Sequence, residues 1–439
     1  MVKEKKIPKI FFGWWTVLAG GITGLWGAGY IVYGFSALFK PISSELGFSR
    51  AAASVPSSIS RLEGGFEAPL IGWATDKFGP RWLLVFGVFL FGLGLILMRY
   101  IGSLWTFYVV WGVLMGTGFN IASSMPINAA IANWFVKKRG LATGIKRVLD
   151  GLSGVIVLPL VAWLIITQGW RMTCFIGGLV TLVVILPIVL FGVKQRRPEH
   201  YGLLPDGAKI TGEAAKDTSH MMDIGVKYAS SVNELEFSLK QALRTPAFWM
   251  LILATASHNL AAPAINIHAI PFLTDTGIDP LGAASIMAIM VIVSIPFRFI
   301  GGIVADRVDK KQLRFILTVC YFLQAFGFGV FLLYQTTAMI YVWFVLYGVG
   351  LGMGSTLNSL IIARYYGRKA FGSIYGILQL LITPVGVLAP VYAGWSFDTT
   401  GSYNTAFSLV AILLAISAAL MFFVRPPKPP ARVTDTRQI

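Results

Sequence analysis

Charged residues, histidine and cysteine are scarce in this chain, and each shortage excludes a kind of site. Only 13% of its 439 residues are Asp, Glu, Lys or Arg, and there are four histidines and two cysteines. Cys174 and Cys320 both stand inside apolar runs, so we expect neither a disulfide framework nor a metal site. The sequence also lacks a Walker loop, a dinucleotide fingerprint and a nucleophile–base constellation. We therefore expect no cofactor and no enzyme activity.

What the chain has in abundance is apolar sequence. Hydrophobic residues make up 56% of it, and its mean hydropathy of +0.72 is far above that of soluble proteins. Apolar runs of about 20 residues, each long enough to cross ~30 Å of hydrocarbon, recur along the chain. We count twelve, at 13–38, 50–74, 82–100, 105–132, 140–166, 171–194, 246–272, 281–305, 312–334, 337–363, 371–395 and 402–424. We expect the first to remain as a membrane helix, because it is too long for a cleavable signal peptide.

The basic residues follow the hydrophobic runs rather than a nucleic-acid surface. The formal net charge is +17, and the Lys and Arg residues concentrate at the ends of runs in alternate connections, as the positive-inside bias describes. This pattern predicts a multi-pass protein of the plasma (inner) membrane, with both termini and the middle loop cytoplasmic and with no nucleic-acid partner.

Two short stretches repeat one pattern in the two parts of the chain. Gly72-Trp-Ala-Thr-Asp76-Lys-Phe-Gly-Pro-Arg81 and Gly302-Ile-Val-Ala-Asp306-Arg307-Val-Asp-Lys-Lys311 each stand between apolar runs. Such repetition is typical of a transporter built from two related halves. We expect the acidic and basic residues of both copies to form a conformational latch at the helix ends: Asp76, Arg81, Asp306 and Arg307.

The chain divides into four parts. We expect an N-terminal six-helix bundle at 1–194, a cytoplasmic linker at 195–245, a C-terminal six-helix bundle at 246–424 and a cytoplasmic tail at 425–439. A short amphipathic helix on the membrane surface is predicted around Val232–Leu243. With the paired motif, this organisation resembles the major facilitator superfamily. The resemblance implies an all-α integral membrane protein of twelve transmembrane helices in two pseudo-symmetric six-helix bundles, a monomer that transports by alternating access.

Further stretches narrow the resemblance. Phe12-Gly-Trp-Trp-Thr, Trp134-Phe-Val-Lys-Lys-Arg139-Gly-Leu-Ala-Thr-Gly144 and Phe371-Gly-Ser-Ile-Tyr-Gly376 are similar to the monocarboxylate and oxalate/formate porters. Arg298 resembles the helix 8 arginine of that group, which implies that it pairs with the substrate carboxylate. The usual charge partners are missing, because Ser294 replaces an acidic residue, Tyr33 replaces a lysine, and 371–395 contains no lysine. The proton relay of the group therefore cannot be transferred to this chain.

Charged side chains inside the second and fifth runs are candidates for a different relay. Each costs roughly 2.5–3.5 kcal/mol at the centre of a membrane helix unless it is paired or faces water. They are Arg61, Glu63, Glu67, Lys146, Arg147 and Asp150, and most of them converge near the midplane. Glu63 and Glu67 are four apart and share a helix face, which makes either a candidate proton carrier. Alternatively, these charges only form interhelical salt bridges that stabilise one transport state.

Uncharged polar residues and one histidine complete the predicted cavity. They come from runs whose helices commonly line the passage in this fold: Tyr30, Tyr33, Asn120, His258 and Gln379. His258 has the intrinsic pKa to titrate near neutral pH, but a hydrogen-bonded packing role is the alternative. Counted with Arg298, the cations inside the runs exceed the carboxylates by one, which an anionic solute would balance.

The sequence thus predicts proton-coupled transport of a small organic anion such as a monocarboxylate, held by Arg298. Its partners are then the solute, protons and the lipid bilayer. Two alternatives stay open. One is an exporter or exchanger of a cationic or drug-like solute, and the other is a receptor on the same fold that binds without transporting.

Overall fold

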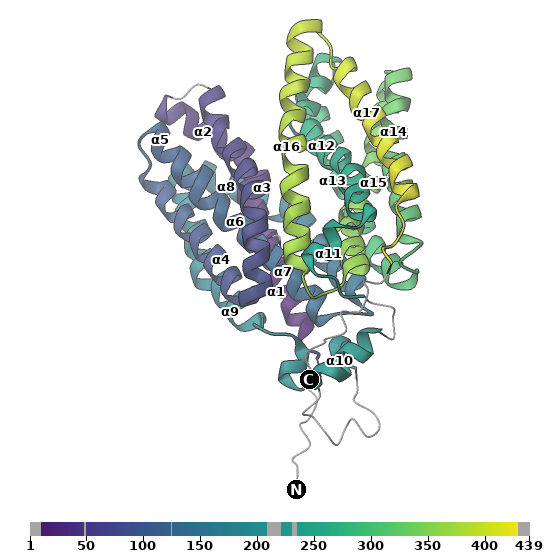
Figure 1. Cartoon of the computed structure of the whole chain (residues 1–439). Helices are drawn as coiled ribbons and strands as arrows, with labels where there is room; N and C mark the ends of the chain where they lie inside the picture. The colour runs from purple at the N-terminus through teal and green to yellow at the C-terminus, as the bar shows by residue number, and fades with distance from the viewer. Residues whose placement is uncertain (1–9, 48–49, 124, 209–220, 231–234, 429–439) are drawn as a thin grey trace.

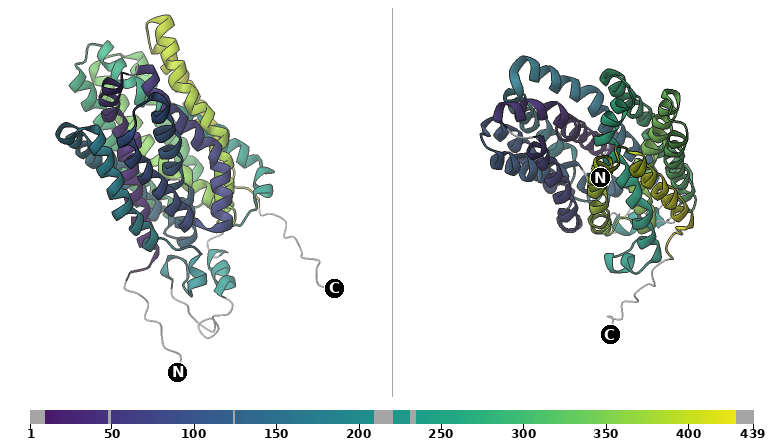
Figure 2. Two further views of the ribbon diagram at one scale, coloured as in Figure 1. Left: turned by 90° about the vertical axis from the view of Figure 1, so that its left-hand side faces the viewer. Right: turned by 90° about the horizontal axis from the view of Figure 1, so that it is seen from above.

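Two bundles of helices stand side by side in this protein. The computed structural model describes residues 10–47, 50–123, 125–208, 221–230 and 235–428, and within these ranges it contains helices but no strand. One bundle is built from residues 13–192 and the other from residues 246–423, as Figure 1 and the view from above in Figure 2 both show. The segment that connects them lies at the lower end of Figure 1, which we call the linker side.

Within the described residues, the N-terminal bundle contains six membrane helices, several of them made of shorter pieces. The first three are α1 (Gly13–Ala28) with the π-helical η1 (Gly29–Tyr33) and α2 (Gly34–Leu46), then α3 (Arg50–Phe78), then α4 (Pro80–Leu97) with η2 (Met98–Tyr100). The fourth comprises α5 (Leu104–Phe107), η3 (Tyr108–Met115), α6 (Gly116–Ser123) and α7 (Met125–Trp134). The fifth and sixth comprise α8 (Arg139–Val180), η4 (Thr181–Ile185) and α9 (Leu186–Gly192). Gly169, at φ 76° and ψ 161°, leaves the helical region and divides α8 between these two spans.

The linker and the C-terminal bundle follow. The linker contains η5 (Pro198–Tyr201), η6 (Pro205–Gly207), α10 (Met221–Ser230) and α11 (Leu239–Leu243). The C-terminal bundle contains α12 (Pro246–Asp275), α13 (Pro280–Arg307), α14 (Leu313–Leu333), α15 (Thr337–Tyr366), α16 (Phe371–Thr400) and α17 (Asn404–Phe423). Of the amphipathic helix expected around 232–243, only α11 is helical. Ser238 starts α11 with a capping box to Gln241, and residues 231–234 lie outside the described part of the chain.

In the described part of the chain, each of the twelve predicted runs is helical over most of its length. Ten helical stretches in the described residues are long and apolar enough to cross a membrane, and one of these, Arg139–Gly192, contains two spans. The remaining span is α3, whose 29 residues are sufficient in length but include Arg61, Glu63, Glu67 and Asp76. Large apolar side chains such as Trp15, Phe86 and Leu388 are exposed on the outside of the bundles, where a protein in water would carry polar residues. The prediction of an all-α membrane fold is confirmed.

The two bundles share a hydrophobic core on the linker side and separate toward the other end (Figure 1). This shared core combines Ile71, Met125 and Ala129 of the N-terminal bundle with Leu360 and Phe371 of the C-terminal bundle. Away from it, each bundle has cores of its own. Helix α3 packs along α16, and α8 packs along α13. These two helix crossings join the N-terminal bundle to the C-terminal bundle.

Glycines allow the closest approach at both crossings. A Cβ on Gly72 would overlap the Gly372 carbonyl, and a Cβ on Gly302 would overlap the Gly140 carbonyl. The backbones therefore touch at two pseudo-equivalent points, and any larger residue there would force the halves apart on the linker side.

Candidate functional site

A cavity of about 330 Å³ lies between the two bundles, beside the shared core. Its walls come mainly from α3, α12 and α16, with single residues of η1, α6 and α7, and its polar lining consists of Arg61, Asn120, Asn259, Gln379 and Thr383. Among the described residues that line it, Arg61 is the one charged side chain. Pockets for small ligands range over ~300–1,000 Å³, so this cavity suits a small solute.

The residues predicted to line the passage divide between the cavity and the bundle interiors. Arg61, Asn120 and Gln379 line the cavity. Tyr30 is fully buried inside the N-terminal bundle, where its hydroxyl donates to the Thr173 carbonyl at 3.3 Å. His258 is buried inside the C-terminal bundle, as the packing alternative describes. Its Nδ1 lies 3.1 Å from Gln324 Oε1, and its ring stacks on Tyr321.

A carboxyl pair lies on another face of α3. Glu63 Oε1 and Glu67 Oε1 lie 2.8 Å and 2.7 Å from the hydroxyl of Thr117 on α6. Glu63 Oε2 is buried and has no hydrogen-bond partner among the described residues. Asn120, one turn further along α6, is within hydrogen-bonding reach of Glu67 and donates to the Ser60 carbonyl at 3.1 Å. One hydroxyl thus joins two carboxyl groups next to the cavity wall.

The charges of α8 form a second group. Lys146 Nζ donates to Asp150 Oδ2 at 2.8 Å and to the Ser123 carbonyl at 3.0 Å. Arg147 Nη1 lies 3.7 Å from the same Asp150 oxygen. Helix α1 passes close by, because a Cβ on Gly24 would overlap Asp150 Oδ1. Asp150 is therefore held between two cations of its own helix.

Arg298 joins this second group from the other half. Its Nη1 donates to the backbone carbonyl of Arg147 at 3.1 Å, and Tyr33 is within hydrogen-bonding reach of its side chain. Neither Arg298 nor Tyr33 is among the residues that line the cavity. In this conformation, Arg298 is a contact between α13 and α8.

Comparison with known proteins decides the family. The profile of the Major Facilitator Superfamily matches residues 21–390. The chain belongs to the major facilitator superfamily. It is accordingly a multi-pass membrane transporter of small molecules and not an enzyme, and the predicted resemblance is confirmed.

Relatives within the superfamily include carboxylate transporters. The chain is 27% identical over 368 residues to monocarboxylate transporter 12-B of Danio rerio, covering 81% of this chain and 75% of that protein. It is 25% identical over 408 residues to the oxalate:formate antiporter of Oxalobacter formigenes, covering 90% and 88%. Among solved structures, the proton:xylose symporter XylE superposes with a TM-score of 0.70 at 16% identity, covering 94% of this chain and 96% of that one. That likeness concerns the fold alone.

The paired motif of this major facilitator protein joins the halves through aspartates and helix N-termini. Asp76, at the end of α3, accepts the backbone N–H groups of Gly372 and Ser373 at 3.0 Å and 2.7 Å. Asp306, at the end of α13, accepts those of Gly140 and Leu141 at 2.6 Å and 2.8 Å. Each carboxylate thus satisfies free N–H groups at the positive end of a helix in the opposite half.

The basic residues of the motif lie elsewhere. Arg364 approaches Asp306 to 3.7 Å, whereas no contact joins Arg81 or Arg307 to either aspartate in the described part of the chain. Arg81 instead packs over the ring of Trp82. The latch geometry therefore rests on the two aspartates.

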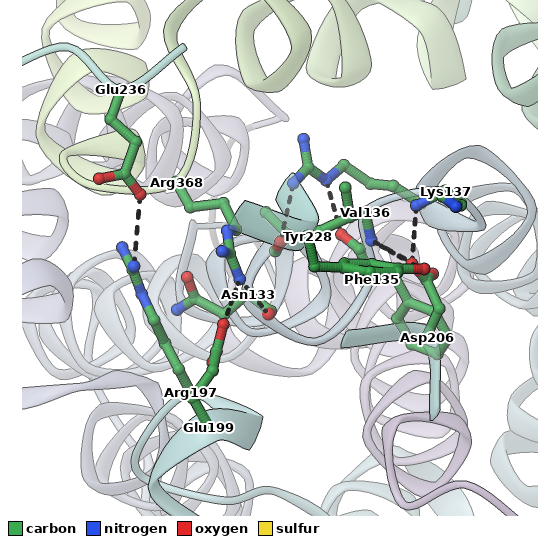
Figure 3. Close-up of polar contacts among 12 residues, drawn as sticks. Asn133, Phe135, Val136, Lys137, Arg197, Glu199, Asp206, Tyr228, Glu236 and Arg368 are labelled. Carbon is green, nitrogen blue, oxygen red and sulfur yellow. Dashed lines mark hydrogen bonds and ion pairs between the residues drawn. The ribbon is translucent and has the colours of Figure 1, made fainter. Parts of the chain in front are cut away.

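Residues of the linker form further polar contacts on the linker side, which Figure 3 shows. Asp206, in a left-handed conformation at φ 61°, accepts the backbone N–H groups of Val136, Lys137 and Lys138 in the connection before α8. The Tyr228 hydroxyl also donates to Asp206 at 3.0 Å. Burial and the negative charge of Asp206 raise the pKa of the Tyr228 phenol, so this group remains a donor at physiological pH.

A buried ion pair connects the linker with both halves. Arg368 Nη1, from the connection before α16, lies 3.2 Å from Glu199 Oε1 and donates to the Asn133 carbonyl of α7 at 3.1 Å. Nearby, Arg197 and Glu236 form a more exposed pair at 3.3 Å. The linker side is thus closed by polar contacts around the shared core.

Several of these residues were not predicted from the sequence. Thr117, Asn259 and Thr383 are ordinary polar residues in apolar runs, and no spacing marks them. Asp206 carried a signal, because Pro205-Asp206-Gly207 is a typical turn sequence. Arg368 is one of the basic residues between runs that the positive-inside pattern treats only as orientation charges, although it is fully buried in an ion pair.

Proposed function

We propose that this major facilitator protein carries a small organic anion, such as a monocarboxylate, together with a proton. The observation that carries the proposal is the contact of one hydroxyl with two carboxyl groups. Thr117 has a single hydroxyl hydrogen and can donate it to only one carboxyl oxygen at a time, yet Glu63 and Glu67 both lie within 2.8 Å. The second contact requires a hydrogen from a carboxyl group. The pair therefore holds one proton between α3 and α6 of the N-terminal bundle, beside the cavity.

The charge balance supports an anionic cargo. When Glu63 and Glu67 share a proton, they contribute one negative charge, and Asp150 contributes another. Lys146 and Arg147 are paired with Asp150, which leaves the guanidinium groups of Arg61 and Arg298 as candidate contacts for a carboxylate. An anion that enters with a proton reduces the charge carried across the membrane, and relatives named for monocarboxylates and oxalate point to the same class of solute.

Alternating access follows from the two related crossings. The present form is closed on the linker side by Asp76, Asp306 and the glycine contacts, and we propose that this side is cytoplasmic, as the positive-inside pattern predicts. Rocking of the halves would open it and close the other side around the cavity. Release of the proton and the anion would then occur toward the linker side.

Transport assays in liposomes test the proposal. The purified protein is reconstituted into liposomes, and the accumulation of labelled acetate, lactate, pyruvate or oxalate inside them is measured. The measurement is made with and without a pH gradient in which the outside is more acidic than the inside. We expect accumulation of at least one carboxylate that depends on the gradient and is abolished by a protonophore. Glu63→Gln with Glu67→Gln should still bind the solute but lose the response to the gradient.

Other results would contradict the proposal in distinct ways. Uptake of cationic or neutral solutes, with no carboxylate transported, would support the exporter or exchanger alternative. Binding without flux would support the receptor alternative. A third result would be carboxylate uptake that is independent of the pH gradient and unchanged in the double variant. That result would support anion transport and refute its coupling to a proton.

A further inference from the structure

Helix α3 presents two different polar faces. Arg61, Gly64, Gly65 and Ala68 stand at positions i, i+3, i+4 and i+7 of one helix face and line the cavity. Glu63 is two residues from Arg61, roughly 200° around the helix, and together with Glu67 it faces Thr117 on α6. A Cβ on Gly64 would overlap the Asn120 amide, and a Cβ on Gly65 would overlap the Thr383 side chain, so the two glycines let α3 approach these cavity residues closely. The cation and the proton-holding pair are therefore separated on one helix.

Arg61 differs from the other membrane cations in having no partner. No hydrogen bond or ion pair joins its guanidinium to any described residue, and its side chain is exposed to the cavity. By contrast, Lys146 and Arg147 contact Asp150, and Arg298 contacts the Arg147 carbonyl. A lone charge inside a membrane span is costly unless water or a counter-ion meets it. Arg61 is thus the cation in the cavity that can accept an anion without breaking an existing contact with a described residue.

Polar groups of the opposite half face Arg61 across the cavity. Gln379 on α16 lines the cavity, and its amide has no partner among the described residues. Asn259 on α12 also lines the cavity. Its amide donates one hydrogen bond, to the Thr255 carbonyl at 2.9 Å, in the described part of the chain. A carboxylate offers two oxygens, which match the paired donors of a guanidinium, and amides can bind a further polar substituent. A small solute would then contact both halves at once.

We propose that Arg61 is the residue that binds the carboxylate of the transported solute in this form, with Gln379 contacting the solute from the other half. Arg298 instead holds α13 against α8. This inference rests on the proposed function, because it assumes that the cargo is a carboxylate. It assigns the anion contact to helix α3, and the solute class to small monocarboxylates with a polar group within reach of the Gln379 amide, such as a hydroxyl or a keto oxygen.

Binding to the purified protein tests this assignment. Melting temperature is measured against concentrations of sodium acetate, lactate, pyruvate and oxalate, because a ligand that binds the folded state raises it by mass action. We expect Arg61→Gln to weaken carboxylate binding at least about thirtyfold, as loss of a hydrogen-bonded charge partner does, and Arg61→Lys to weaken it less. The exposed linker variant Arg196→Gln should bind as the unmodified protein does.

A second measurement needs no variant in the cavity. Phenylglyoxal modifies accessible arginines, and mass spectrometry follows the peptides that contain Arg61 and Arg298. Lactate should protect Arg61 from modification and leave Arg298 unchanged. Gln379→Leu should weaken lactate binding more than acetate binding, because acetate lacks the hydroxyl group.

The outcomes separate the two proposals. If no carboxylate stabilises the unmodified protein, the proposed function fails. If carboxylates do stabilise it, but Arg61→Gln binds them equally and lactate gives Arg61 no protection, the function stands and this assignment is wrong. Loss of binding in Arg298→Gln with retention in Arg61→Gln would move the carboxylate to Arg298.

Discussion

Replacement of Glu199 by Gln should loosen the linker side of the transporter. Glu199 Oε1 lies 3.2 Å from Arg368 Nη1, with only 1% and 0% of the two side chains exposed. The same Nη1 donates to the Asn133 carbonyl at 3.1 Å. Since Asn133 belongs to the N-terminal half and Arg368 to the C-terminal half, their contact must break when the linker side opens, and we expect the ion pair with Glu199 to break with it. The substitution removes the charge of the carboxylate and leaves the guanidinium buried.

The size of the effect follows from that geometry. A hydrogen bond to a charged group contributes about 1.5–3 kcal/mol, and each 1.4 kcal/mol is about a factor of ten in an equilibrium. We therefore expect the fraction of molecules open on the linker side to rise roughly 10- to 100-fold. The melting temperature should fall as well, because the ion pair also contributes to the stability of the closed form.

Cysteine labelling measures this opening. The two natural cysteines, Cys174 and Cys320, are buried, and Ala129→Cys places a thiol in the shared core at a position that is 3% exposed. Its reaction rate with a water-soluble maleimide should increase when Glu199→Gln is added. The matched control is Glu236→Gln, because Glu236 and Arg197 are 32% and 19% exposed and such a pair contributes only ~0–1 kcal/mol. Equal labelling in the two variants, with the fold intact, would refute the role of the buried pair.

Three further predictions concern single residues. Asp206→Ala should lower the melting temperature, because it removes the acceptor of three backbone N–H groups and of Tyr228; an unchanged value would contradict this. Gly302→Ala should increase linker-side labelling, since its Cβ meets the Gly140 carbonyl, whereas Gly329→Ala, with nothing within 4 Å, should not. Thr117→Val should abolish uptake driven by the pH gradient, whereas Thr117→Ser should retain it. Gradient-driven uptake by the valine variant would show that the hydroxyl of Thr117 is not required for coupling.

The sequence predicted the architecture well because the bilayer imposes it. Hydrophobic runs of sufficient length must become helices in hydrocarbon, and the repeated motif around Asp76 and Asp306 indicated two related halves. Even α3 was predicted as a span, although its charges make it too polar to qualify by hydropathy within the described residues. Each membrane helix can therefore be predicted from its own stretch of sequence, without knowledge of the residues that pack against it.

The site was harder to predict, because it depends on how each helix is rotated and on what lies opposite. The four-residue spacing of Glu63 and Glu67 correctly placed them on one face, but no pattern could identify Thr117 as their shared partner. His258 and Arg298 were predicted to line a central site, because both lie inside apolar runs. Position in a run does not specify direction, and His258 faces Gln324 inside its own bundle while Arg298 faces the Arg147 carbonyl.

Asn120 is the residue through which the proton and the anion can influence each other. It lines the cavity that Arg61 enters, it is within hydrogen-bonding reach of Glu67, and it donates to the carbonyl of Ser60, next to Arg61 on α3. We propose that a change in the protonation of Glu67 changes whether Glu67 accepts a hydrogen from the Asn120 amide, and hence the dipole that Asn120 presents to the cavity. We expect Asn120→Leu to keep carboxylate binding, because Arg61 remains, but to lose accumulation driven by a pH gradient. If Asn120→Leu still accumulates the solute against its gradient, the two sites communicate by another route, and the close approach of α3 to α16 at Gly65 and Thr383 becomes the place to look.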